Sequence, residues 1–233
     1  MGKLRIVSHS SKPFLDRREA GRLLGEELLQ LRGQKPVVLG IPRGGVIIAR
    51  ELAAVLNGDL DIVLSRKLRT PGNLELAMGS VAEDGNLFLN NDVVQQLNIS
   101  DAEIQRERAL QMQEIARRVA MFRKALPKTS LQDRLVIITD DGVATGATTQ
   151  AALWSVRLEK PKKLIAAIPV GAQDSLERLA KDVDEEICLR APPYFAAVGQ
   201  FYVRFDQVED EDVLKVLQTE AERRNRLKVE TRR

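Results

Sequence analysis

The sequence predicts an α/β fold in which helices flank an open parallel sheet, and three observations lead to that prediction. Short apolar runs of strand length alternate along the chain with longer runs of helical periodicity. Two of the short runs pass through a glycine-containing loop straight into a helix, the order of a parallel strand and its crossover helix. The 233 residues, 44% of them hydrophobic, suffice for one such domain over residues 1–233.

The charge balance and the single cysteine restrict the class of protein. Thirty-six basic and 33 acidic side chains leave a net charge of +3, which gives no reason to expect nucleic acid as a partner. Cys188 has no second cysteine to pair with, which fits a reducing compartment, and its apolar neighbours favour a core position. Neither a membrane-spanning run nor a leader is recognisable, so we expect a cytoplasmic protein without a membrane partner.

The N-terminal part is expected to begin irregularly and then to form a helix. We interpret residues 1–14 as irregular, and the only histidine, His9, lies in a polar stretch that predicts exposure to solvent. Asp16 and Glu19 form a capping box, and leucines at helical spacing continue to a C-cap glycine, Gly33. The pattern predicts a helix over residues 16–33 with a leucine face on the core.

The next segments predict two neighbouring parallel strands. Residues 37–41 form an apolar run that ends in Pro42, Arg43, Gly44 and Gly45 before a helical run over 46–56. Residues 59–65 predict the following strand, which ends at two basic side chains. Because the carboxyl ends of parallel strands meet at one edge of a sheet, we expect the following residues to face the same crevice as the glycine loop: Arg66 and Lys67.

The middle of the chain predicts a long connection, a hairpin and a long helix. Residues 66–79 contain Pro71-Gly72-Asn73, which marks a mobile connection, with Glu75 as the acid in its middle. Residues 80–82 and 87–89 predict a hairpin. A capping box at Ser100 opens a helical run over 100–126 whose apolar stripe predicts packing beside the mobile connection or against a second subunit.

The stretch over residues 135–149, LVIITDDGVATGATT, carries the strongest functional signal. An apolar strand ends in Asp140 and Asp141, and a loop of glycine, alanine and threonine leads into a helix. Amides from Ala144 to Thr148 at that helix N-terminus would bind an anion such as a phosphate monoester. The two carboxylates would repel phosphate but can accept hydrogen bonds from two vicinal hydroxyls. Phosphate and diol together indicate ribose 5-phosphate.

This stretch resembles the signature of the type I phosphoribosyltransferases, which bind 5-phosphoribosyl 1-diphosphate (PRPP). The resemblance implies a Rossmann-like open parallel sheet with a flexible flap, a helical insertion and a hood. It implies that Asp140 and Asp141 hold the ribose hydroxyls, and that the 5′-phosphate lies on Ala144, Thr145, Gly146, Ala147 and Thr148. A P-loop would need lysine where Ala147 stands, and the dinucleotide fingerprint is missing. A buried strand with solvated or metal-binding acids is the simpler alternative, but it leaves the amide and threonine run unexplained.

The same resemblance assigns roles to the other basic residues. It implies that pyrophosphate lies on Arg43, Gly44, Gly45, Arg66 and Lys67, since glycine backbone permits close approach and arginine supplies charged hydrogen bonds. A plain turn with a solvated Arg43 is the alternative. Residues 66–79 would be the flap that excludes water, Glu75 a candidate for proton transfer, and Mg²⁺ would be carried mainly by the substrate rather than by an all-protein cage. The predicted catalytic set is Arg43, Lys67 and Glu75.

The C-terminal third predicts two further strands around a helix, then a hood and a last helix. The strands cover 164–169 and 186–189, the latter at an edge, with a helix over 174–181 between them. The aromatic segment within 190–206 resembles the hood of related enzymes, in which Tyr194 or Phe195 would stack on the acceptor, and core packing is the alternative. Asp206 and Glu209 predict the cap of a helix with a basic tail over 209–233.

The predicted activity is Mg²⁺-dependent transfer of the 5-phosphoribosyl group from PRPP to an acceptor, with release of pyrophosphate, in a homodimer that serves nucleotide salvage. A nitrogenous base is the expected acceptor. In the 6-oxopurine enzymes of the family an acid precedes the Thr-Gly of the phosphate loop, and Ala144 stands there in this chain, which speaks against that group. The alternative function is a regulatory protein that binds PRPP without transferring it, although no helix-turn-helix module or strong basic bias supports that alternative.

Overall fold

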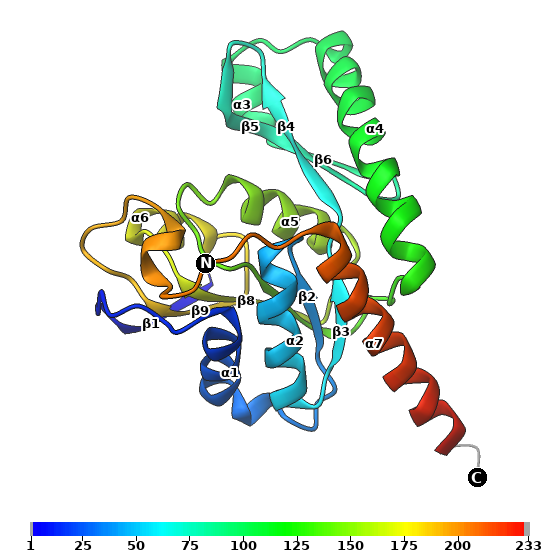
Figure 1. The fold of residues 1–233 in the computed structure, drawn as a ribbon. Coiled ribbons are helices and arrows are strands. Elements are labelled where there is room, and N and C mark those ends of the chain that lie inside the picture. The colour runs from blue at the N-terminus through cyan, green and yellow to red at the C-terminus, as the bar shows by residue number, and fades with distance from the viewer. Residues whose placement is uncertain (1, 231–233) are drawn as a thin grey trace.

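The core is a six-stranded sheet in which every pair of neighbouring strands is parallel (Figure 1). The computed structural model describes residues 2–230, without the side chains of 74, 75, 228 and 230. The strands follow one another across the sheet in the order β1 (Lys3–Ser8), β9 (Glu185–Arg190), β8 (Lys163–Val170), β7 (Leu135–Thr139), β2 (Val37–Gly40) and β3 (Asp59–Ile62). The predicted open parallel sheet is therefore confirmed.

Helices cover both faces of this sheet, which explains why its strands are apolar on both sides. Successive residues of β7 alternate between two cores, with Ile137 in one and Val136 and Ile138 in the other. The first core is closed by helices α1 (Arg17–Glu27), α2 (Gly44–Leu56) and α7 (Asp210–Glu230), and the second by α5 (Ala147–Leu158) and α6 (Gln173–Leu179).

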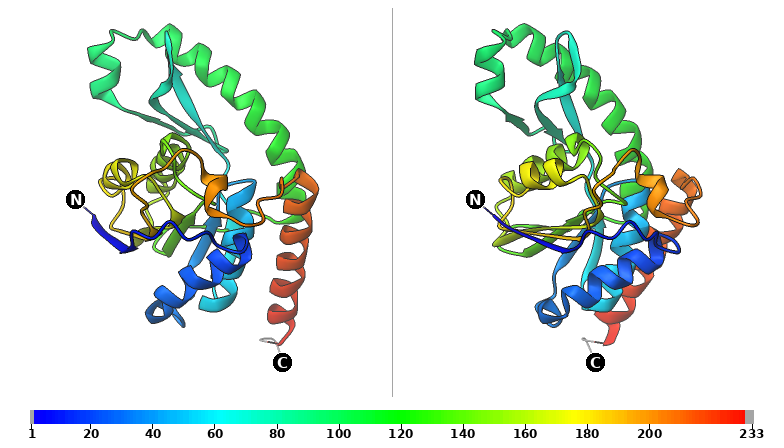
Figure 2. Two further views of the ribbon diagram at one scale, coloured as in Figure 1. Left: turned by 60° about the vertical axis from the view of Figure 1, so that its left-hand side comes forward. Right: turned by 90° about the vertical axis from the view of Figure 1, so that its left-hand side faces the viewer.

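A second, antiparallel sheet projects from the core together with the long helix (Figure 2). We call residues 65–125 the arm. It comprises β4 (Ser65–Thr70), β5 (Asn73–Ala82), β6 (Leu87–Leu89), α3 (Asn91–Gln96) and α4 (Asp101–Ala125). Its own apolar cluster includes Leu68 and Met78 from the sheet and Ile104 and Ile115 from α4. The long helix thus packs on the strands beside it, one of the two positions that its apolar stripe predicts.

Arg123 fastens the C-terminal end of α4 to both sheets. Its guanidinium donates to Asp61 Oδ1 at 2.6 Å and forms two hydrogen bonds of 2.7 Å with the Glu83 carboxylate. Asp61, at 1% exposure, belongs to β3, and it also accepts from the Thr129 amide at 2.7 Å. One arginine therefore joins the arm to the last strand of the core.

Several predicted elements are confirmed, and others differ from the expectation. The 80–82 and 87–89 hairpin is present as β5 and β6, and the Ser100 capping box opens α4. The segment over 66–79 is a hairpin of β4 and β5 rather than an irregular connection, so its polar sequence is held by strand pairing. Whether the hairpin moves as a flap stays a prediction.

The two chain ends differ more. The expectation of an irregular start is wrong, because β1 pairs in parallel with β9, and that pairing also places β9 inside the sheet rather than at its edge. The first helix ends at Glu27 and a short 3-10 helix, Leu29–Leu31, precedes Gly33. The last helix begins at Asp210 rather than at an Asp206 cap, and the tail residues 231–233 lie outside the described part. Within residues 2–230, no helix combines the length and hydrophobicity needed to cross a bilayer.

Candidate functional site

The predicted site lies where the direction of chain winding reverses in the sheet. From β2 the chain continues through α2 to β3 on one side, whereas β7, on the other side of β2, leads to β8. The carboxyl ends of β2 and β7 are in register, Gly40 opposite Thr139, and the Ile41 amide donates to the Thr139 carbonyl at 3.0 Å. In open α/β sheets such a switch point forms the ligand crevice.

The two acids and the glycine loop lie against each other in this crevice. The Asp141 amide donates to Asp140 Oδ1 at 2.9 Å. A Cβ at Gly45 would lie 2.8 Å from the Thr139 carbonyl oxygen, and one at Gly44 would collide with Asp141 Oδ2. Only glycine permits this approach, so the sequence Gly44-Gly45 brings the predicted pyrophosphate loop to the predicted ribose acids. The peptide bond between Pro42 and Arg43 is cis.

Arg17 holds the Asp141 carboxylate. Its Nε donates to Asp141 Oδ2 at 2.9 Å and its Nη1 donates to the Asp206 carbonyl at 2.8 Å. Its guanidinium also lies 3.9 Å from the centre of the Phe205 ring, while the Tyr202 hydroxyl donates to the Asp141 carbonyl at 2.6 Å. The Arg17 and Asp141 side chains are only 10% and 18% exposed, so this ion pair is poorly screened by solvent.

The two acids therefore differ electrostatically. Burial and the neighbouring charge of Asp141 raise the pKa of Asp140 well above its usual value. Burial, followed by the charge of Asp141, raises the pKa of the Tyr202 hydroxyl, which keeps it a hydrogen-bond donor. Among the described residues, Asp140 Oδ2 and Asp141 Oδ1 accept no hydrogen bond, so both carboxyl groups have an oxygen with which to accept from a ligand hydroxyl.

The loop after β7 has the geometry of an anion site. Gly146 adopts a φ of 76°, which lets the chain turn sharply into α5. Within the described residues, no group accepts a hydrogen bond from the amides between Ala144 and Thr149. The loop carbonyls are held from behind, since Ser175 Oγ donates to Ala144 at 2.6 Å and Arg178 donates to Thr145 at 3.1 Å. Several convergent donors at a helix N-terminus favour a phosphate.

The arm closes the third side of the crevice and leaves a cavity of about 290 Å³. We call it the arm cavity. Both loops of the core reach it, through Pro42 and Thr148, and β4 supplies Arg66 and Lys67. The predicted pyrophosphate cations thus face the phosphate-loop helix across this space, as expected from their place after the strand. Arg43 lies beside it, with Nη1 4.0 Å from the carboxylates of Glu209 and Asp210.

The predicted hood is only partly near the site. Tyr194 is 86% exposed, and Phe195 packs on Phe201, with 5.0 Å between ring centres. Val198, in the short 3-10 helix η2 (Val198–Phe201), lies against Gly142, the residue after Asp141, because a Cβ at Gly142 would meet Val198 Cγ1 at 2.6 Å. Glu75 belongs to β5, and its side chain lies outside the described part.

Sequence reasoning did not identify Arg17. Its position directly after the Asp16 N-cap gives no sign of a role beyond the helix start, and its partner lies 124 residues away. Tyr202 belongs to the aromatic segment considered for the hood, but its hydroxyl contact with Asp141 follows only from the folded chain.

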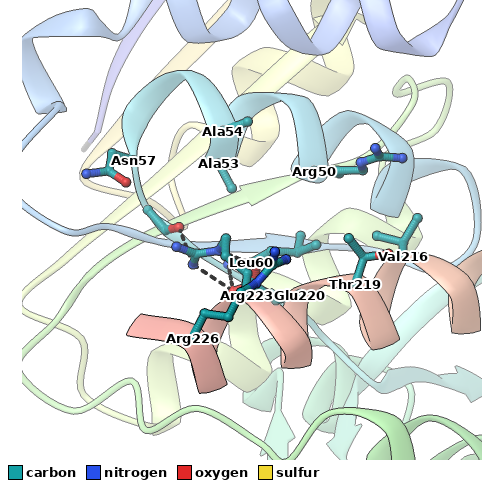
Figure 3. Close-up of a pocket in the computed structure, with 11 residues that line it drawn as sticks. Arg50, Ala53, Ala54, Asn57, Leu60, Val216, Thr219, Glu220, Arg223 and Arg226 are labelled. Atoms are coloured by element: carbon teal, nitrogen blue, oxygen red, sulfur yellow. Dashed lines mark hydrogen bonds and ion pairs between the residues drawn. The ribbon is translucent and has the colours of Figure 1, made fainter. Parts of the chain in front are cut away.

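A second cavity, of about 380 Å³, lies between α2 and α7 (Figure 3). Arg50 and Arg226 are among the residues that line it, and Arg223 forms hydrogen bonds with the Glu220 carboxylate. Among the predicted site residues whose side chains are described, none lines this cavity. Within the described residues, no group of three or more His, Cys, Asp or Glu side chains could hold a metal ion.

Comparison with known proteins gives relatives along most of the chain. Residues 14–205 match the family model of the phosphoribosyl transferase domain. Two Mycobacterium tuberculosis proteins, MT0597 and Rv0571c, whose names carry a provisional assignment as phosphoribosyl transferases, are 42% identical over 206 residues, 88% of this chain and 46% of theirs. The chain thus spans about half the length of these curated relatives. The crystal structure of TT1426 from Thermus thermophilus has a TM-score of 0.84 at 43% identity and covers 89% of this chain and 98% of its own.

Proposed function

The chain belongs to the phosphoribosyl transferase domain family, and on that premise we propose that it transfers the 5-phosphoribosyl group of PRPP to an acceptor and releases pyrophosphate. One observation carries the proposal. At a single switch point, unbonded loop amides, two carboxylates with oxygens open to a ligand and a glycine loop flanked by cations lie together. Phosphate, diol and diphosphate are the three groups that PRPP presents.

Each part of the substrate has a matching group. The 5′-phosphate accepts hydrogen bonds from the amides between Ala144 and Thr148, at the N-terminus of α5. The ribose hydroxyls donate to Asp140 and Asp141. The diphosphate lies on the Arg43 to Gly45 loop, with Arg66 and Lys67 of the arm above it.

The chemistry then requires positioning and charge more than a covalent intermediate. The bond between C1 and the diphosphate oxygen breaks with its electron pair going to the diphosphate, the acceptor nitrogen forms the new bond to C1, and the acceptor loses a proton. Arg43, Arg66 and Lys67 stabilise the negative charge that develops on the leaving group. Mg²⁺, carried by the diphosphate, would neutralise part of the same charge. Glu75 is the candidate for receiving the proton.

A nitrogenous base is the proposed acceptor. In the 6-oxopurine enzymes an acid serves the purine, and Ala144 stands at that position in this chain. Tyr194, a predicted stacking residue, is exposed to solvent, so it does not indicate which base is bound. Assembly as a homodimer, a cytoplasmic location and a part in nucleotide salvage remain predictions.

The direct test is pyrophosphate release from PRPP and Mg²⁺ with a panel of purine, pyrimidine and pyridine bases. We expect release with at least one base, and loss of both release and PRPP binding when Asp140 and Asp141 are both replaced by alanine. The matched control replaces Asp174, in the first turn of α6 and outside the crevice. Tight PRPP binding without release for any base would favour the regulatory alternative, and no binding of PRPP at all would exclude both functions.

A further inference from the structure

Helix α4 reaches the arm cavity with one cation that the proposed function does not use. Three of its side chains line the cavity, Gln111, Ile115 and Arg118. Gln111 is 3% exposed and accepts a hydrogen bond of 3.1 Å from Arg66 Nε, so the helix also orients a cation of β4. The predicted insertion is therefore part of the cavity wall as well as a support for the hairpin.

Arg118 differs from its neighbour on the same helix. Arg117 points outward, with 56% of its side chain exposed, and lies 3.5 Å from Asp210 Oδ2. Arg118 is half-buried, lines the cavity and makes no hydrogen bond or ion pair within the described part of the chain. A half-buried guanidinium normally has an anionic partner, because desolvation without one costs free energy.

Other positive charges near Arg118 destabilise its guanidinium further in the absence of an anionic partner. β4 contributes Arg66, Lys67 and Arg69 to the same cavity, and among the described residues no carboxylate lines it. Burial lowers the pKa of Arg118, the nearby Asp210 raises it, and the charges of Arg66, Arg117 and Arg43 lower it further. An anion in this space would relieve the repulsion among several cations at once.

We infer that Arg118 binds the diphosphate of PRPP, and the pyrophosphate that leaves, from the wall of the arm cavity that helix α4 forms. The inference rests on the proposed function, which supplies the ligand. Two lining residues connect the cavity to the proposed substrate site: Pro42 directly precedes the Arg43 to Gly45 loop, and Thr148 belongs to the run of loop amides proposed to bind the 5′-phosphate. Helix α4 would then complete the diphosphate site.

The test compares the dissociation constants of three probes, Mg²⁺-pyrophosphate, PRPP and ribose 5-phosphate, by calorimetry on the full chain. Arg118→Gln should weaken pyrophosphate and PRPP by about tenfold or more, as for loss of a hydrogen bond to a charged group, and leave ribose 5-phosphate within about twofold. Arg118→Lys should restore part of the loss by returning the charge. Arg117→Gln, the adjacent control, should leave all three within about twofold.

The outcomes separate the inference from its premise. If the wild-type chain binds PRPP and Arg118→Gln binds it equally well, the inference is overturned while the proposed function stands. Equal losses for ribose 5-phosphate and PRPP would also overturn it, since Arg118 would then act on the fold of the site. A wild-type chain that binds neither PRPP nor pyrophosphate would refute the proposed function and the inference together. Unchanged thermal unfolding of each variant checks that the arm is intact.

Discussion

Arg17 shows how a single buried ion pair can hold a carboxylate of the candidate site, that of Asp141. Replacing it with methionine would leave Asp141 charged, poorly solvated and without its partner. We expect Arg17→Met to lower the free energy of unfolding by about 3 kcal/mol and to weaken PRPP binding. Urea unfolding and calorimetry measure the two effects. Arg18→Met, at the exposed neighbour, should change neither. A stable Arg17→Met variant with unchanged PRPP affinity would contradict the assigned role.

Gly44 tests the contact between the two loops. Because a Cβ there would collide with Asp141 Oδ2, we expect Gly44→Ala to displace the carboxylate and to weaken PRPP binding by at least tenfold. Gly33→Ala is the control. Nothing lies within 4 Å of its Cβ position, and the cost is confined to its φ of 88°, about 1 kcal/mol of stability. Similar PRPP affinities in both variants would show that the loops are not coupled.

Glu186 predicts a pH dependence of stability. It is fully buried in β9 without a hydrogen-bond partner among the described residues, and burial, followed by the charge of Asp182, raises its pKa to about 8. The folded chain then holds the proton more tightly than the unfolded chain, whose glutamate has a pKa near its ordinary 4.5. Its contribution to stability is complete below about pH 4.5 and is lost as the pH rises to 8, by up to roughly 5 kcal/mol.

Urea unfolding of wild type and Glu186→Gln between pH 5 and 8 measures this effect. The stability difference between the two proteins should shift in favour of the variant as the pH rises. Glu185→Gln, which removes the neighbouring carboxylate paired with Lys163, should keep the wild-type slope. Parallel pH profiles for wild type and Glu186→Gln would show that Glu186 is not the titrating group.

At the scale of the element, Arg123 decides how firmly the arm is attached. Arg123→Met would leave Asp61 and Glu83 without their guanidinium in a buried setting, so we expect the arm to lose about 3 kcal/mol of local stability. Hydrogen exchange should accelerate in β4, β5 and α4 and stay unchanged in β7 and β8. Lys124→Met, at an exposed neighbour, should leave the pattern as in wild type. Uniform acceleration across the chain would instead indicate global destabilisation.

Local signals predict most elements, and tertiary pairing explains the exceptions. The residues of β7 and of the start of α4 carry local signals, an apolar run and a capping box, so both elements appear where the sequence predicts them. β1 has no such local signal, because Lys3–Ser8 is half polar and becomes a strand through its pairing with β9, about 180 residues later. The basic, proline-containing hairpin of β4 and β5 resembles a loop for the same reason: its pairing and its packing on α4 are not local.

At the scale of the whole molecule, some site residues follow from strand order and others only from tertiary packing. The acids, the predicted phosphate loop and the glycine loop follow strands that are adjacent in the sheet, so strand order alone brings them together. Arg17 and Arg118 reach the crevice from α1 and α4, and no sequence signal predicts that these helices lie beside it. The hood stays a prediction: Tyr194 is exposed, Phe195 packs on Phe201, and Val198 lies against Gly142, the residue after the two acids.

Helix α6 supports the predicted phosphate loop from outside the crevice. Ser175 and Arg178 belong to α6 and donate hydrogen bonds to the two loop carbonyls, whose orientation determines where the loop amides point. The loop is thus preorganised before a ligand binds, so ordering it on binding costs little conformational entropy. Substitutions in α6 that remove these hydrogen bonds are therefore expected to weaken ligand binding indirectly, through the conformation of the loop.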